Sequence, residues 1–190
     1  MIVCIIDAQT QNMDFNQYLA KFVTGNLTTS QLPEIAEIGL RQGLDTPSLR
    51  ILTGLGKGDN VSEIDHYFKL MLDELTIQLP EKRDAALIYA AAIVDDIISG
   101  EIDIIAGVTF IRLEAMDCHD FFSESEHYCY DSIGFDKIYG LYVQYNDVED
   151  GEINWHTEKS QDQLLEEIET EMLDEIKKWQ IELRTMHNIK

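Results

Sequence analysis

Residues 84–99 read DAALIYAAAIVDDIIS and form the most apolar stretch of the chain. Apolar and small residues run without interruption from Ala85 to Val94, which is too short to cross a bilayer, since a spanning helix needs about 20 residues. A segment that is apolar on nearly every side is typical of a helix in the middle of a core. Pro80 and Gly100 flank it, as is common at the two ends of a helix. We therefore expect a buried central helix with other helices packed around it.

Apolar residues recur at helical spacing on both sides of this segment, with capping residues between the runs. The segment 135–147 is ambiguous, because it fits a helix and its part 137–145 also fits an alternating strand. A helix is favoured, since no clear partner strand exists elsewhere. Residues 117–131 are expected to form one or two short helices.

The expected fold is all-α: an irregular array or bundle of about eight helices, with a stack of helical repeats and an α+β fold as alternatives. Residues 1–12 are expected to be an extension or a short strand. Residues 13–190 are then a single helical domain, which consists of helix pairs in 13–79 and an acidic C-terminal part in 80–190.

The chain carries 36 acidic and 14 basic residues, a net charge of −22. The charge is uneven, because residues 114–152 hold 11 acidic residues against the single base Lys137. Nucleic acids and anionic membranes both need cations on the protein, so neither is an expected partner. A basic protein, in contrast, would be attracted over a long range.

The three cysteines, Cys4, Cys118 and Cys129, contain no Cys-x-x-Cys pair. This odd number argues against a disulfide framework and favours a reducing compartment. The start of the chain has no basic flank and no small-residue cleavage site, so we expect no secretory signal and a cytoplasmic location.

Two Glu-x-x-His pairs place an acid and a histidine three residues apart, as in di-iron bundles of the ferritin type. Such a metal site would use Glu63, His66, Glu124 and His127, with Glu37 and Glu114 as further ligands. The alternative interpretation is that both glutamates belong to helix starts, Glu63 in a capping box with Asn60. This interpretation is favoured, so no metal is expected.

The sequence gives only weak evidence for any other catalytic site. Cys118 is next to His119, but acidic surroundings suppress a thiolate and favour a structural cysteine. At least one carboxylate of Asp95–Asp96 is expected to face solvent. The sequence contains no P-loop, no dinucleotide fingerprint and no nucleophile elbow. We therefore expect no cofactor, and the sequence favours a protein that is not an enzyme.

The aromatic and acidic region 117–152 is the strongest candidate for a binding surface. Rings among carboxylates can hold lysine and arginine side chains by stacking and by charge-assisted hydrogen bonds. The residues predicted to bind the partner are Asp117, Asp120, Glu124, Glu126, Tyr128, Tyr130, Asp131, Asp147, Glu149 and Asp150.

Three stretches resemble a family of small acidic bacterial proteins that is uncharacterised: LDTPSLRILTGL at 44–55, ISGEIDIIAG at 98–107 and FDKIYGLYVQYNDVEDG at 135–151. The resemblance extends over about 13–151. It departs from the family pattern at Ile104 and Ile105, which stand where that pattern has a proline-containing turn. It implies a helical fold and carries over no known activity, and these proteins are similar to immunity proteins only in size and charge.

The function expected from these features is binding: an acidic cytoplasmic protein of the immunity or inhibitor type that docks a basic protein through 117–152. The two alternatives are the carboxylate–histidine metalloprotein and a helical scaffold subunit of a larger assembly.

Overall fold

The computed structural model describes residues 13–56, 58–151 and 159–187, and in these residues it contains eight α-helices and no strand. The expectation of an all-α fold is confirmed. The segment that also fitted a strand is helix α7, so the α+β alternative is wrong. The expectation for residues 1–12 lies outside the described residues. The helices are α1 Phe15–Val23, α2 Leu32–Arg41, α3 Pro47–Thr53, α4 Val61–Leu75, α5 Lys82–Ser99, α6 Ile104–Phe110, α7 Asp136–Glu149 and α8 Gln161–His187.

Several helices begin at a residue whose side chain caps the first turn. Asp14 Oδ1 accepts the N–H of Gln17 at 2.8 Å, and the Gln17 side chain accepts the N–H of Asp14 at 2.7 Å, which closes a capping box at α1. Asp103 caps α6 through the N–H of Ala106. Asn60 caps α4 through the N–H of Ser62, two residues on, so the capping box predicted with Glu63 is wrong.

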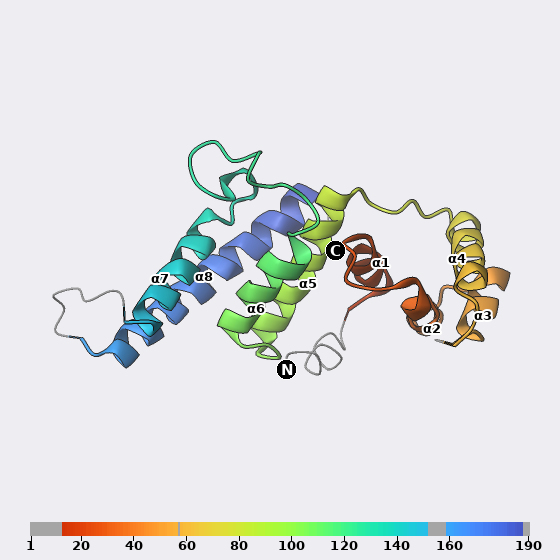
Figure 1. Ribbon diagram of the computed structural model, residues 1–190, viewed down its shortest axis with the longest axis horizontal. Helices are drawn as coiled ribbons and strands as arrows, with labels where there is room; N and C mark the ends of the chain where they lie inside the picture. The colour runs from red at the N-terminus through yellow and green to blue at the C-terminus, as the bar shows by residue number, and fades with distance from the viewer. Residues whose placement is uncertain (1–12, 57, 152–158, 188–190) are drawn as a thin grey trace.

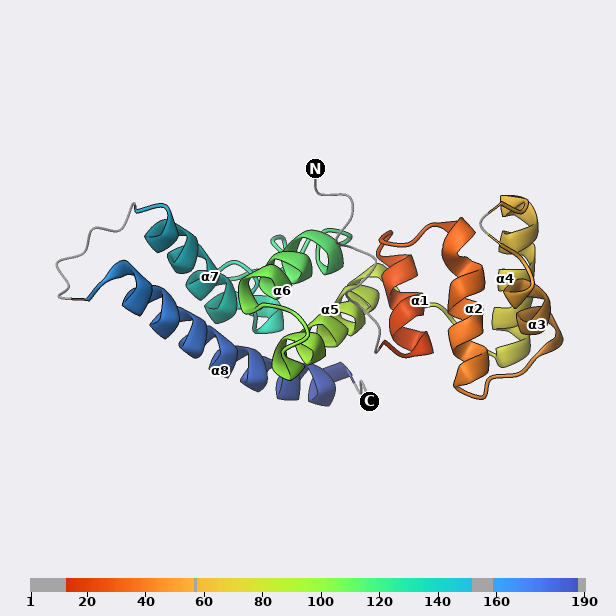
Figure 2. The same cartoon turned by 90° about the horizontal axis from the view of Figure 1, so that it is seen from below.

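The helices pack around two hydrophobic cores, which Figures 1 and 2 show as two halves of an elongated molecule. One core lies among α1, α2, α3 and α4. The other surrounds α5, the predicted central helix, with α6, α7 and α8 around it. Helix α1 belongs to both, because its Phe15 and Leu19 pack in the first core while its Ala20, with Met13 just before the helix, packs in the second. The two halves are therefore joined through one shared helix.

Ionisable side chains are buried where α1 packs against α5. Lys21 is only 5% exposed, and its Nζ lies 5.3 Å from the ring centre of the buried Tyr89. The Tyr89 hydroxyl donates to Glu114 Oε2 at 2.9 Å. Asp96 is 7% exposed, and its Oδ2 has no hydrogen-bond partner among the described residues. The apolar pattern of α5 gives no sign that ionisable groups are buried against it.

Helices α5 and α6 approach closely at Gly107. A Cβ at this position would lie 2.4 Å from Cγ1 of Ile97, a distance that forces the backbone or Ile97 to move. We expect Gly107→Ala to lower the free energy of unfolding by about 1–3 kcal/mol, the usual cost of overpacking, as measured by urea denaturation.

Gly140 provides the matched control for Gly107, because it lies in the middle of α7 with no heavy atom within 4 Å of a Cβ built on it. Gly140→Ala should raise stability by about 0.5–1 kcal/mol through helix propensity alone. Equal effects of the two substitutions would contradict the close approach of α5 and α6.

The segment 117–131 is a series of turns that leads into the 3₁₀ turn Asp131–Ile133, so the prediction of short α-helices there is wrong. Its short polar side chains bind nearby backbone groups and compete with helix formation. Ser123 Oγ donates to the carbonyl of Asp120 at 2.8 Å, and Ser125 Oγ donates to that of Phe121 at 3.0 Å.

Candidate functional site

Residues 117–131, here called the acidic loop, project from the second half of the molecule between α6 and α7 (Figure 1). The loop contains seven of the ten residues predicted to bind a partner. Its shape is fixed by three sets of contacts, which hold its end, its middle and its return into the core.

Asp131 fixes the end of the loop. Its carboxylate accepts the backbone N–H groups of Glu126 at 3.0 Å, His127 at 2.7 Å and Tyr128 at 3.1 Å. These hydrogen bonds lower the pKa of Asp131, because they stabilise the ionised form. This carboxylate therefore has a structural role, and it orders the segment that presents Tyr128.

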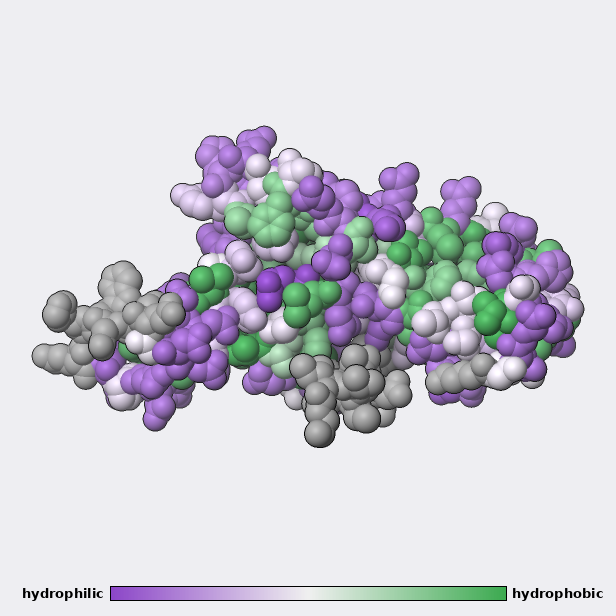
Figure 3. Space-filling view, in the orientation of Figure 1, coloured by the Kyte–Doolittle hydropathy of each residue, from purple (hydrophilic) through white to green (hydrophobic). Residues whose placement is uncertain are grey.

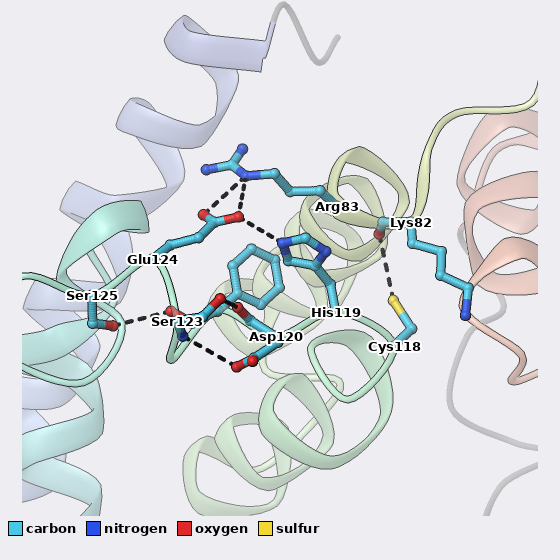
Figure 4. A network of polar contacts seen from close by, with 9 residues as sticks. Lys82, Arg83, Cys118, His119, Asp120, Ser123, Glu124 and Ser125 are labelled. Carbon is cyan, nitrogen blue, oxygen red and sulfur yellow. Dashed lines mark hydrogen bonds and ion pairs between the residues drawn. The ribbon is translucent and has the colours of Figure 1, made fainter.

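Glu124 fixes the middle of the loop to the start of α5 (Figure 4). It accepts from Arg83 Nε at 3.1 Å, and its Oε1 lies 2.6 Å from Nε2 of His119. The hydrogen bond with His119, with Arg83 in support, lowers the pKa of Glu124. Arg83 also lies over the ring of Phe121, with Cζ 5.8 Å from its centre. Glu124 thus holds the loop against the core.

Tyr130 is the point where the loop returns to the core. It is 5% exposed, and its ring packs against Phe122, Phe135 and Tyr139 at centroid distances of 4.7, 5.8 and 5.1 Å. Its backbone has φ +67°, a left-handed conformation that costs a residue with a Cβ roughly 1–2 kcal/mol. Tyr130 was predicted to be part of the partner surface, and its burial removes it from that surface.

The remaining side chains of the loop form an exposed face. Tyr128 is 72% exposed and Phe122 is 53% exposed, which is unusual for large rings. The exposed carboxylates of Asp117, Asp120 and Glu126 lie in the same loop, and none of the three forms an ion pair with any described residue. Figure 3 shows hydrophilic residues beside an apolar area at this projecting part of the molecule. We call these five residues the loop face.

The other three predicted residues lie elsewhere. Asp147, Glu149 and Asp150 are at the C-terminal end of α7, whereas the loop joins its N-terminal end (Figure 1). The 14 residues of α7 separate the two groups by about 20 Å. The structure therefore divides the predicted surface into two acidic patches, because one helix runs between them.

The two Glu-x-x-His pairs do not come together. Glu63 and His66 lie on α4 in one half of the molecule, and Glu124 and His127 lie in the acidic loop in the other. The second pair is outside any helix, so the premise of a shared helical face is wrong for it. Across the described ranges, no cluster of three or more His, Cys, Asp or Glu side chains has the spacing to hold a metal ion.

The other reactive side chains are used in packing. Cys118 Sγ donates to the carbonyl of Lys82 at 3.4 Å, and burial raises the pKa of this thiol, so the thiolate is suppressed. Asp95 accepts from Arg184 at 2.8 Å and from Gln180, both on α8, while its neighbour Asp96 is buried. The two carboxylates therefore face different surroundings and form no pair.

Sequence reasoning missed both the contact of Arg83 with Glu124 and the cavity beside Arg112 that is described below. Arg83 and Glu124 are 41 residues apart, and no periodicity connects them. The one sequence signal for this cavity was the position of Arg112, a single arginine next to a strongly acidic segment.

Comparisons with known proteins found no match: no family model, no curated protein and no solved structure is similar to this chain. None of the helices in the described ranges combines the length and the apolar character that crossing a membrane requires.

Proposed function

We propose that this protein binds a basic protein partner through its loop face and blocks or carries that partner in the manner of an immunity or inhibitor protein. The observation that carries the proposal is the exposure of Tyr128 and Phe122 among Asp117, Asp120 and Glu126, on a loop whose backbone is already ordered. Free cysteine thiols at 118 and 129 support a reducing location, the cytoplasm.

Preorganisation favours binding by such a loop. A disordered acidic segment would lose conformational entropy on association, and that loss subtracts from the affinity. Here Asp131 and Glu124 supply the order in the free protein. The loop face can then use its rings as anchors and its carboxylates to select lysine and arginine on the partner.

The net charge of −22 should raise the rate constant for association with a basic partner. Long-range attraction raises the rate at which a basic partner arrives, and salt screens it, with a Debye length of about 10 Å at 0.1 M and about 3 Å at 1 M. Binding should therefore weaken steadily as salt rises. Residual binding at high salt would come from Tyr128 and Phe122, since apolar contacts are not screened.

A charge-reversal variant tests whether the loop face itself binds the partner or whether the overall negative charge of the protein is enough. The variant Asp117→Lys, Asp120→Lys, Glu126→Lys should lose capture of the partner from a lysate of the native host. It leaves Glu124 and Asp131 in place, so the loop keeps their contacts and loses only the hydrogen bond from the Ser123 N–H to Asp120 Oδ1. Circular dichroism and thermal unfolding would show that the fold is retained.

The matched control is Asp147→Lys, Glu149→Lys, Asp150→Lys, which changes the net charge by the same amount at the far end of α7. This control should keep the partner and only slow its binding. Loss of capture in both variants, or in neither, would contradict the proposal.

Tyr128→Ala should weaken the isolated complex roughly tenfold or more, as expected for an aromatic anchor.

A further inference from the structure

A cavity of about 320 Å³ opens beside the acidic loop and contains polar groups that the protein leaves without partners. It is at the small end of the range for ligand pockets, which is roughly 300–1,000 Å³. The residues that line it are Arg112, Met116, Asp117, Cys118, His119, Asp120, Phe122 and Tyr130.

Arg112 is the first unpartnered group. In a chain with 36 acidic residues, each of the other arginines forms an ion pair with a carboxylate: Arg41, Arg50, Arg83 and Arg184. Arg112 forms no ion pair and no hydrogen bond with a described residue, and its Nε is buried without an acceptor. Its guanidinium is held on one side by Tyr142, whose ring centre lies 5.6 Å from Cζ. Buried donors in native proteins are rarely left in this state.

Tyr130 is the second unpartnered group. The residue is 95% buried, but its hydroxyl reaches the surface of the molecule and forms no hydrogen bond with a described residue. Burial raises the pKa of this phenol, and Arg112 and Asp117 line the same cavity as Tyr130. The left-handed backbone at Tyr130 adds strain at the same place, as is common at binding sites.

We propose that this cavity binds a zwitterionic ligand, an α-amino acid with a large apolar or aromatic side chain. Its carboxylate binds the guanidinium of Arg112 and accepts a hydrogen bond from the Tyr130 hydroxyl. Its ammonium binds Asp117 and Asp120 at the rim, and its apolar side chain packs on Phe122 and Met116. Each polar group of the cavity then has a partner of the matching charge.

The rim carboxylates select against other anions. Phosphate and dicarboxylates carry two negative charges, which Asp117 and Asp120 repel, whereas one carboxylate beside one ammonium suits both ends of the cavity. The site is separate from the protein-docking function in its chemistry, although Asp117, Asp120 and Phe122 belong to both. It can be tested with the purified protein alone, so its failure would leave the partner proposal standing.

The test is isothermal titration calorimetry of the purified full chain with L-phenylalanine, L-leucine and L-methionine, supported by the shift in melting temperature. At least one amino acid should bind with a saturable heat. For L-phenylalanine, 3-phenylpropanoate lacks the ammonium and 2-phenylethylamine lacks the carboxylate, and both should bind at least tenfold more weakly. No saturable binding at about 10 mM of all three amino acids would overturn the proposal.

Variants assign the roles within the cavity. Tyr130→Phe keeps the buried ring and removes only the hydroxyl, so it should fold normally and bind roughly tenfold or more weakly. Arg112→Gln should lose binding, and Asp117→Asn with Asp120→Asn should remove the preference for the amino acid over 3-phenylpropanoate. Arg41→Gln, at an exposed position on α2, is the control and should bind like the native protein. Unchanged affinity in Tyr130→Phe and Arg112→Gln would also overturn the proposal.

Discussion

Replacing Trp179 with alanine is expected to lower the free energy of unfolding by about 3–5 kcal/mol, the largest effect of any single substitution considered for this protein. Trp179 is fully buried on α8, and its indole Nε1–H donates to the carbonyl of Ile133 at 2.7 Å. Its ring packs against Phe135 at a centroid distance of 4.8 Å. One side chain thus joins the last helix to the segment that ends the acidic loop, and its removal leaves both a cavity and an unpartnered carbonyl.

Urea denaturation followed by circular dichroism measures this loss. Ile181→Ala is the control on the same helix, because Ile181 is 66% exposed and its truncation should change stability by less than about 0.5 kcal/mol. Trp179→Phe should fall between the two, since it keeps much of the volume but loses the hydrogen bond. A loss below about 1 kcal/mol in Trp179→Ala would contradict the packing of α8 against the end of the loop.

The contribution of Asp96 to stability should decrease as the pH rises from about 4 to about 7. Burial raises the pKa of Asp96 to about 6, the carboxylates of Asp95 and Glu101 add to the rise, and Lys21 opposes it. An aspartate in the unfolded chain titrates near 3.9. Between these values the folded protein holds a proton that the unfolded chain releases. The contribution of this group is therefore most favourable below about pH 4 and decreases through pH 6, by about 3 kcal/mol in all.

Asp96→Asn isolates this effect, because the amide cannot ionise. At pH 7.5 the variant should be more stable than the native protein by about 1–3 kcal/mol, and its advantage should disappear as the pH approaches 4. Asp147→Asn makes the same change of charge at the far end of α7 and should show a small difference that varies little with pH. Denaturation curves at several pH values measure all three proteins. The free energies of unfolding of Asp96→Asn and the native protein should therefore differ by an amount that changes with pH. A difference that stays constant with pH would contradict the burial of an ionisable Asp96 between α1 and α5.

Local signals in the sequence were enough to predict most of the fold. The apolar run of α5 predicts its central position. The lack of a partner strand correctly favoured a helix at 135–147, where the structure has α7. These signals involve residues within a few positions of each other, where spacing alone decides which groups meet.

The candidate site could be predicted only in part, because it depends on contacts between distant residues. The acidic and aromatic composition identified the loop and its exposed Tyr128. Composition could not show that Glu124 is held by Arg83, that Tyr130 is buried, or that α7 carries Asp147 away from the loop. Each of these facts depends on how helices far apart in the chain are arranged, which no local pattern records.

The central claim, that the loop face docks a basic partner, is tested most directly by hydrogen–deuterium exchange of the protein alone and in complex with the partner that it captures. We predict slower exchange in residues 117–131 on binding, with no change in α2, α3 and α4 or at the C-terminal end of α7. Protection that leaves 117–131 unchanged and appears in another part of the molecule would contradict the claim.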